Sequence, residues 1–370
     1  MCDRPVLSTE INLSDCLSCA GCVSVDEEED KSHLQGIDLI KAGGANIIIT
    51  PQAKMALYST GRKGSFRLFE HSLVKYFGAL GNTVVDSTVG TRILLEREKA
   101  LLKRQGTVIS TICPGTVLYL QNALEGIDPQ LSHNLSPVEI AAKYAREISP
   151  KKCVSIVMCK DKRVEAKNNT HIDYCITAKE MQESLLGQEE IHGGAGKEPP
   201  PTENSTPWEP SRQDYTEFEY MHSVSRILEG STTGGVFEGI SAHLLCEAGP
   251  QEGRLVTVKS MKTHNEKAIL PGGKKVLQLF GSSRIIAFTS KLKKDKSVLE
   301  QYAYIEMSMC TGGCLYGPSQ GTAVDASLYA AVQQDKVSQE SVEYPAASPG
   351  EERTFAAYKK KKRRNYLVEW

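Results

Sequence analysis

Short apolar runs and amphipathic segments alternate along much of this 370-residue chain. Residues 55–81 and 94–104 space their apolar positions in the way that is typical of helices. Four runs rich in β-branched residues predict buried strands: 45–50, 82–89, 106–113 and 154–159. Because strand-like and helix-like segments alternate, the pattern predicts an α/β fold with a parallel sheet.

A long polar interval divides this pattern into two parts. Residues 187–222 are rich in proline, glycine and acidic residues, which predicts an exposed connection. Strand-like runs then return at 254–261, 275–281 and 303–310. We therefore expect a cysteine-rich head, a first α/β lobe, the connection, a second α/β lobe and a basic tail, with the bounds 1–44, 45–186, 187–222, 223–345 and 346–370.

Composition narrows the class of protein. Lysine and arginine number 44 and aspartate and glutamate 45, so the net charge of -1 gives no general attraction to nucleic acid or to anionic membranes. We expect no membrane-spanning segment, because no apolar run reaches about 18 residues. The first residues also lack the pattern of a secretory signal. In a reducing compartment, 11 cysteines favour metal sites or core positions over disulfides.

The head carries three closely spaced thiols. Cys16, Cys19 and Cys22 follow the C-x2-C-x2-C spacing with which a loop surrounds an iron–sulfur cube. Zinc sites normally come as two paired dyads, so the even triplet favours a cluster, with zinc as the alternative. A bacterial ferredoxin would place its fourth cysteine at the position occupied here by Asp26.

Four more cysteines follow predicted strands or lie in glycine-rich turns: Cys113, Cys159, Cys310 and Cys314. Sites in parallel α/β sheets collect at the carboxyl ends of the strands, so these thiols could form one four-thiolate site. Spacing alone leaves open whether they converge, and a simple glycine-rich turn is the alternative for MCTGGC. We expect the remaining cysteines to be ordinary small apolar residues: Cys153, Cys175 and Cys246.

Motifs of other chemistries are missing from the sequence. It contains no P-loop, no H-E-x-x-H, no G-x-S-x-G and no G-x-G-x-x-G. A Cys–His hydrolase built on Cys113 stays open as an alternative, although nothing singles out its base among the eight histidines.

Taken in order, four motifs resemble the iron-only hydrogenase superfamily: C-x2-C-x2-C, CPG, C-x-D-K-x-x-E and E-x-x-x-C-x-x-G-C. Ser136-Pro137 and the TTGGVFE stretch at 232–238 extend this similarity through most of residues 10–320. The resemblance implies an iron-only hydrogenase-like α/β fold, in which two α/β lobes with parallel sheets carry a small N-terminal ferredoxin-like cluster-binding head.

The resemblance also implies two 4Fe–4S clusters. One would be bound in the head by Cys2, Cys16, Cys19 and Cys22, because related proteins have their fourth head ligand upstream of the triplet. The other would be bound between the lobes by Cys113, Cys159, Cys310 and Cys314. Lys162 and Glu165 are expected to balance thiolate charge and to orient the loop around Cys159.

Within the superfamily, the sequence is similar to the cytosolic iron–sulfur assembly branch, the nuclear prelamin A recognition factor-like proteins. In true hydrogenases, as the resemblance has it, a cysteine beside the CPG cysteine relays protons to a di-iron centre, and here that position is Ile112. Thr116 and Met158 replace a usual tryptophan and proline. We therefore expect a cluster protein without hydrogenase activity; a working redox enzyme of hydrogenase type is the alternative.

The branch implies a role in cytosolic iron–sulfur protein assembly, between an early scaffold NTPase complex and a targeting complex that serves cytosolic and nuclear proteins. Its members end in an aromatic residue, so Val368, Glu369 and Trp370 are expected to dock on the targeting complex. The basic run Lys359–Arg364 is expected to be a solvated tail, with a nuclear-import or nucleic-acid patch as the alternative. The expected location is the cytoplasm, with a nuclear pool also open.

Overall fold

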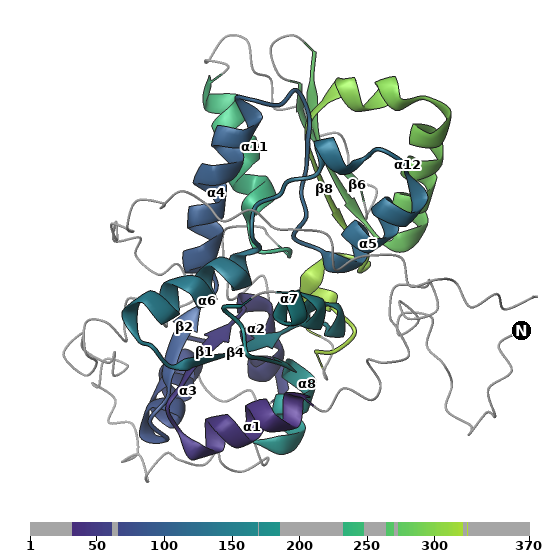
Figure 1. The fold of residues 1–370 in the computed structure, drawn as a ribbon. Helices are drawn as coiled ribbons and strands as arrows, with labels where there is room; N and C mark the ends of the chain where they lie inside the picture. The colour runs from purple at the N-terminus through teal and green to yellow at the C-terminus, as the bar shows by residue number, and fades with distance from the viewer. Residues whose placement is uncertain are drawn as a thin grey trace, which may run out of the picture.

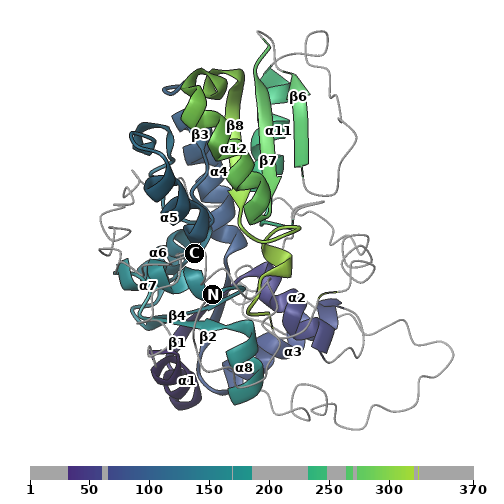
Figure 2. The same cartoon turned by 90° about the vertical axis from the view of Figure 1, so that its right-hand side faces the viewer.

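The computed structural model describes residues 32–60, 66–168, 170–185, 232–247, 264–269 and 273–320, together with Val324. These residues form two lobes, one above the other in two perpendicular views (Figures 1 and 2). None of the helices in the described ranges is long and apolar enough to cross a bilayer.

Several expected features lie outside the described residues. They are the head up to residue 31, the connection 187–222 and the tail 346–370. The corresponding candidate residues are Cys2, Cys16, Cys19, Cys22, Val368, Glu369 and Trp370.

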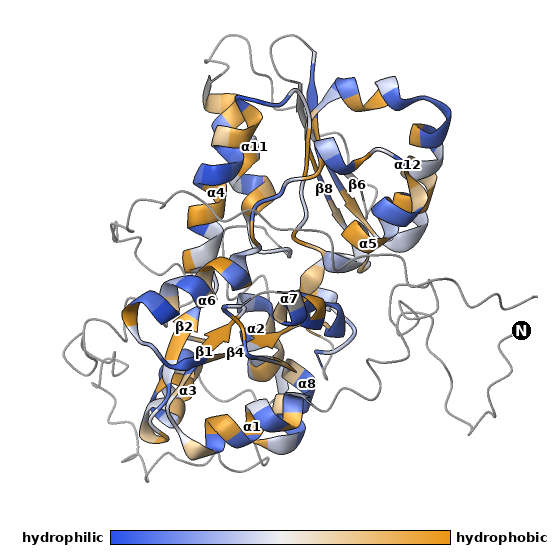
Figure 3. Cartoon of the chain, viewed as in Figure 1, coloured by the Kyte–Doolittle hydropathy of each residue, from blue (hydrophilic) through white to orange (hydrophobic). Residues whose placement is uncertain are grey.

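The lower lobe in Figure 1 contains a sheet of four parallel strands in the order β2–β1–β4–β5. Their bounds are Ala45–Ile49 for β1, Thr83–Asp86 for β2, Lys152–Val157 for β4 and Tyr174–Thr177 for β5. Every residue of β1 is buried, because this strand lies inside the sheet and helices cover both of its faces. Such a strand requires a mainly apolar sequence, and the isoleucines of β1 provide it (Figure 3). The one polar residue of β1, Asn46, donates from its amide to Ser149 O at 2.9 Å.

The helices of the first lobe divide between the two faces of this sheet. One face packs on α1 (Ser32–Ala42), α2 (Pro51–Thr60), α3 (Phe66–Ala79) and α8 (Ala178–Ser184). The other face packs on α6 (Pro137–Ile148). Ile47 and Ile49 point to the first face and Ile48 to the second, as the period of two in a strand requires.

The upper lobe contains a second four-stranded sheet in the order β3–β8–β7–β6. Its strands are β3 (Val108–Ile109), β6 (His264–Ile269), β7 (Lys275–Phe280) and β8 (Tyr302–Ser308), of which β6 alone runs antiparallel to its neighbour. One face is covered by α5 (Pro114–Ala123) and α12 (Ser282–Lys294), and the other by α4 (Thr88–Leu102) and α11 (Val236–Glu247).

The chain crosses between the two sheets inside the interval 45–186, which we expected to form the first lobe alone. Helix α4 begins after β2 of the first sheet, and β3 then pairs with β8 of the second. Helix α5 packs into the core of the second lobe, and the chain returns through α6. An apolar run in a sequence predicts a strand but not the partner of that strand, so the pattern gave no sign of this crossing.

Most of the predicted elements are confirmed. The runs at 45–50, 82–89, 154–159, 275–281 and 303–310 all contain strands. The run at 106–113 contributes a strand of two residues, and the predicted helical stretch at 55–81 holds two helices, α2 and α3. The run at 254–261 lies outside the described residues, and β5 and β6 were not predicted.

A buried ion cluster joins three elements of the first lobe. Lys54 of α2 is 1% exposed, and its Nζ lies 2.6 Å from Glu70 Oε1 of α3 and 2.5 Å from Asp86 Oδ2 at the end of β2. Burial lowers the pKa of Lys54, but the carboxylates of Asp86 and Glu70 outweigh this effect and raise it overall. The ammonium therefore stays charged and holds α2, α3 and β2 together.

We predict that Lys54→Met destabilises the protein by about 3–5 kcal/mol, because it leaves two carboxylates buried without their cation. The control is Lys99→Met, which breaks a pair between Lys99 and Glu96 with side chains 27% and 66% exposed. In that variant the free energy of unfolding should fall by less than about 1 kcal/mol. Urea unfolding measures both, and equal losses would contradict the prediction.

Candidate metal centre

Two cysteines leave the second sheet at the same edge. Strands β3 and β8 are parallel neighbours, with Ile109 opposite Ile305. Cys113 follows β3 and occupies the N-cap position of α5 without a capping hydrogen bond from its side chain, and Cys310 follows β8. Because parallel neighbours end at the same edge, the pairing of β3 with β8 brings Cys113 and Cys310 together.

The other two cysteines, Cys159 and Cys314, lie against the first lobe. Cys159 follows β4 and precedes the 3₁₀-helix η5 (Lys160–Lys162). Cys314 opens the 3₁₀-helix η8 (Cys314–Tyr316) and packs with Val157 and Met158 in the core of the first lobe. The four thiols therefore come from connections on both sides of the interface between the lobes.

The electrostatics of these thiols agree with this placement. Burial raises the pKa of Cys159 well above its ordinary value, and Asp161 and the other three thiols raise it further. Burial also raises the pKa of Cys310, with contributions from Cys314 and Cys113. For Cys314, burial and Cys113 raise the pKa to about 12, although Lys162 and Ser308 act in the opposite direction. The structure thus places the four thiols within electrostatic range of one another.

This donor set fits a 4Fe–4S cube. Four cysteine thiolates are the usual ligands of such a cluster. In a buried site the thiolates repel one another, so deprotonation needs a cationic centre that they can bind. Among the described residues, no group of three or more histidine, cysteine, aspartate or glutamate side chains is arranged to hold a single metal ion.

Glycines shape the turn between the last two thiols. Gly312 and Gly313 have φ values of +82° and +96°, in the left-handed region that favours glycine. A Cβ on Gly313 would overlap the hydroxyl of Thr232, and Leu315 N donates to Thr232 O at 2.9 Å. The TTGG segment at 232–235 therefore packs directly on the cysteine turn.

Lys162 and Glu165 form a buried chain that ends beside Cys113. Lys162 Nζ donates to Ile112 O and to Glu165 Oε1, both at 2.7 Å. Glu165 Oε2 accepts from Ser136 Oγ at 2.8 Å, and Ser136 caps α6. The lysine brings a positive charge near Cys314, and the chain fixes the backbone before Cys113.

The three positions at which the resemblance expected a departure from hydrogenases have structural roles here. Ile112 belongs to the core of the second lobe, and Met158 packs with Cys159 and Cys314. Thr116 is buried, and its hydroxyl donates to Met307 O at 3.1 Å, which ties α5 to β8. Two of these residues therefore pack in apolar cores, and the third holds a helix to a strand.

Two buried glutamates of the second lobe were not predicted as site residues, although Glu306 belongs to the E-x-x-x-C-x-x-G-C motif. Glu306 Oε1 accepts from Thr233 Oγ1 at 2.7 Å and from Gln278 Nε2 at 2.9 Å. Burial and the nearby Glu238 raise the pKa of Glu306 to about 7. The position of Glu306 in the E-x-x-x-C motif, four residues before Cys310, is the sequence feature that could have identified it as a site residue.

Glu98 is the second of these glutamates and lies on α4. It is 2% exposed and accepts hydrogen bonds from Ser132 Oγ and Asn134 Nδ2. Burial raises its pKa to about 7, although both hydrogen bonds lower it. The sequence missed Glu98 because the charged pattern of this helix indicates solvent, whereas α4 packs between other elements.

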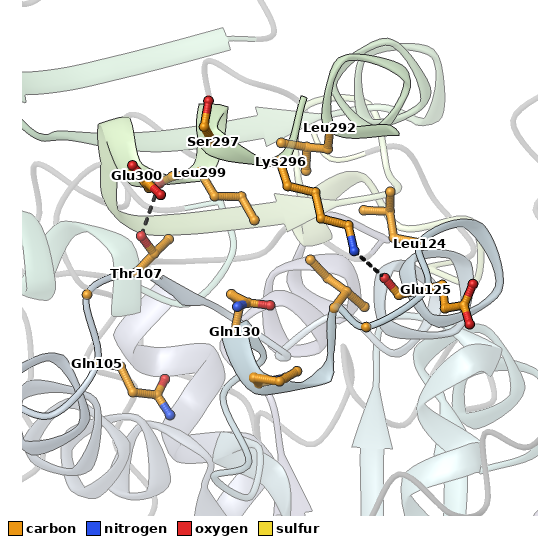
Figure 4. Close-up of a pocket in the computed structure, with 14 residues that line it drawn as sticks. Gln105, Thr107, Leu124, Glu125, Gln130, Leu292, Lys296, Ser297, Leu299 and Glu300 are labelled. Carbon is orange, nitrogen blue, oxygen red and sulfur yellow. Dashed lines mark hydrogen bonds between the residues drawn. The ribbon is translucent and has the colours of Figure 1, made fainter. Parts of the chain in front are cut away.

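A cavity of about 500 Å³ lies away from the thiols (Figure 4). It is formed where Thr107 precedes β3 and where Leu299 and Glu300 precede β8, at the opposite ends of these strands from Cys113 and Cys310. Lys296 Nζ crosses one side of it and donates to Glu125 O at 2.9 Å. None of the candidate ligands lines this cavity.

The arrangement of the two lobes is that of known FeFe-hydrogenases. An apo HydA1 variant from Chlamydomonas reinhardtii superposes with a TM-score of 0.55 over 85% of this chain and 92% of that chain, at 15% identity. Another HydA1 variant from the same alga gives 0.52 over 82% and 88%, at 18% identity. At such low identity the likeness establishes the class of fold.

The sequence defines the family. Residues 46–318 match the iron only hydrogenase large subunit, C-terminal domain, and the chain belongs to this family. It is also similar to proteins named cytosolic Fe-S cluster assembly factor NAR1. The one from Encephalitozoon cuniculi is 24% identical over 97% of this chain and 94% of its own length. The one from Kluyveromyces lactis is 27% identical over 78% and 64%. The predicted resemblance is confirmed.

We predict that Glu98 makes the stability depend on pH. Because its folded-state pKa is raised from 4.5 to about 7, its contribution is present below pH 4.5 and is lost as the pH rises through 7. Between pH 5 and pH 8 the free energy of unfolding should fall by about 2 kcal/mol more in the wild-type protein than in the Glu98→Gln variant. The exposed Glu96→Gln should follow the wild type in urea unfolding. If the unfolding free energy of Glu98→Gln fell with pH as steeply as that of the wild type, Glu98 would not be the source of the pH dependence.

Proposed function

We propose that this chain acts in cytosolic iron–sulfur protein assembly and binds two 4Fe–4S clusters. One observation carries the proposal: four thiols converge at the lobe interface of a hydrogenase-family fold in which Ile112 stands beside the first of them. The similarity to proteins named as assembly factors supports the same role.

In this proposal Cys113, Cys159, Cys310 and Cys314 hold the cluster between the lobes. A bound 4Fe–4S cluster supplies an iron centre that can exchange an electron or be passed to a recipient protein. Lys162 offsets thiolate charge, and its bonds to Ile112 O and Glu165 keep the neighbouring backbone in place. The turn at Gly312 and Gly313 allows the last two thiols to face the same centre.

The second proposed cluster belongs to the head, with Cys2, Cys16, Cys19 and Cys22 as ligands. We further propose that the chain links an early scaffold NTPase complex to a targeting complex, in the cytoplasm and with access to nuclear recipients. Trp370, with Val368 and Glu369, would dock on the targeting complex. The ring would fill a pocket and the carboxylates would meet cations or backbone amides.

The proposal excludes hydrogen turnover as the function. A proton relay next to the first ligand needs a side chain that can carry a proton, and Ile112 is apolar and packed in the core. The ammonium of Lys162 is already bonded to Ile112 O and Glu165. The residues around the thiols therefore support cluster binding rather than acid–base chemistry.

We predict about eight irons and about eight acid-labile sulfides per chain after anaerobic purification, as two cubes require. Cys159→Ser should lower both numbers to about four, because one ligand of the interface cluster is lost. Cys246→Ser is the matched control, since Cys246 is an exposed thiol of α11, and it should change neither number.

The Cys2→Ala variant tests the head. A fall to about four irons would support Cys2 as the fourth ligand of that cluster. An unchanged iron content would assign this ligand elsewhere. Zinc in place of iron, in colourless wild-type protein, would overturn the cluster assignment altogether.

We also predict that the iron-loaded protein evolves no hydrogen from reduced viologen above the level of Cys159→Ser. The physical reason is that Ile112 cannot relay a proton to a metal site. Gas chromatography measures the product, and the iron content of the same sample verifies its loading. Hydrogen evolution that disappears in Cys159→Ser would establish the redox enzyme instead.

A further inference from the structure

The chain passes from the second lobe to the first immediately after the last thiols. Strand β8 lies in the second sheet, whereas Leu315 packs in a core of the first lobe. A Cβ on Gly317 would lie 2.6 Å from Met158 O at the end of β4, which shows how closely this segment approaches the first sheet. The segment 310–320, which we term the cysteine loop, is therefore the covalent bridge at the site.

One buried amide fastens the end of the cysteine loop to the first lobe. Gln320 is 4% exposed, and its Nε2 donates to Gln52 O at 3.2 Å, in the first turn of α2. The same nitrogen donates to Leu315 O at 3.4 Å and to Cys314 O at 3.5 Å, so its two hydrogens are shared among three carbonyls. The carboxamide thus connects α2 to the backbone of a candidate ligand.

Other contacts hold the cysteine loop from both sides. Lys179 N of α8 donates to Ser319 O at 3.1 Å on the side of the first lobe. On the other side, Leu315 N donates to Thr232 O, and Thr233 bonds to the buried Glu306 of β8. Gln320 differs from these partners because its side chain reaches the carbonyl of Cys314 itself.

We propose that Gln320 is the positioning residue for Cys314, and that a cluster bound by the four thiols clasps the two lobes together. This inference rests on the proposed cluster site. Cys113 and Cys310 leave the second sheet, whereas Cys159 and Cys314 pack on the first, so the bonds to a shared cluster cross the interface. Gln320 holds the backbone of Cys314 on the first lobe before and after the cluster binds.

Gln320→Met tests the positioning role, because methionine has a similar shape and lacks the N–H donors. Gln182→Met is the matched control: Gln182 Nε2 donates to Ala56 O and Thr60 Oγ1 in the first lobe, away from the thiols. We expect unchanged iron content in both variants. In Gln320→Met an iron chelator should strip one cluster about tenfold faster, as is typical when a partner of a metal ligand is lost. The EPR spectrum of the reduced interface cluster should also shift.

Wild-type rates and spectra in Gln320→Met would overturn the inference and leave the proposed function intact. A wild-type protein without iron would instead overturn the proposed function. Should Gln320→Met fail to fold by circular dichroism, hydrogen exchange on the unmodified protein decides the question. Removing the clusters should then expose the amide of Leu315, which donates to Thr232 O on the other side of the loop, while the amides of β1 and of Lys179, on the side that Gln320 holds, stay protected. Unchanged protection of Leu315, or exposure of Lys179, would overturn the inference.

Discussion

The gathering of four cysteines at the interface between the lobes is the constraint on which much of this structure depends. In a low-dielectric interior, the charged forms of Cys159, Cys310 and Cys314 are disfavoured by burial and by one another. Bringing such groups together costs free energy that a cationic centre can offset. The glycine turn, the buried ammonium of Lys162 and the strand pairing all serve to hold the thiols despite that cost.

The shared site depends on the placement of β3, a short strand that pairs in the second sheet and not in the first. If β3 joined the first sheet, Cys113 would end at a different edge from Cys310. Because β3 pairs with β8 instead, the two thiols emerge side by side, and the segments that return to the first lobe carry Cys159 and Cys314 toward them. The interface between the lobes and the thiol site are therefore one feature of the architecture.

The family fold is retained here while the residues beside the thiols have a different chemical character. Ile112 and Met158 pack in apolar cores, and the Thr116 hydroxyl ties α5 to β8. Of the three, Ile112 occupies the position at which the resemblance places a proton-carrying group. The buried ionisable groups away from the thiols include the Lys54 ion cluster, which holds three elements of the first lobe together, and the glutamates Glu98 and Glu306, whose charged forms are disfavoured by burial. The fold alone does not fix the chemistry of a protein, which depends on the residues at the site.

The sequence by itself determined the α/β class, the strands that hold the most apolar runs and the four strand-end thiols of the described lobes. Local burial and spacing decide these features, so they can be read from nearby residues. Tertiary structure alone decided that β3 belongs to the second sheet and that Glu98 lies inside. It alone decided that Gln320 reaches both Gln52 and Cys314. These features depend on contacts between distant segments, and the pattern of a single segment does not encode its partner.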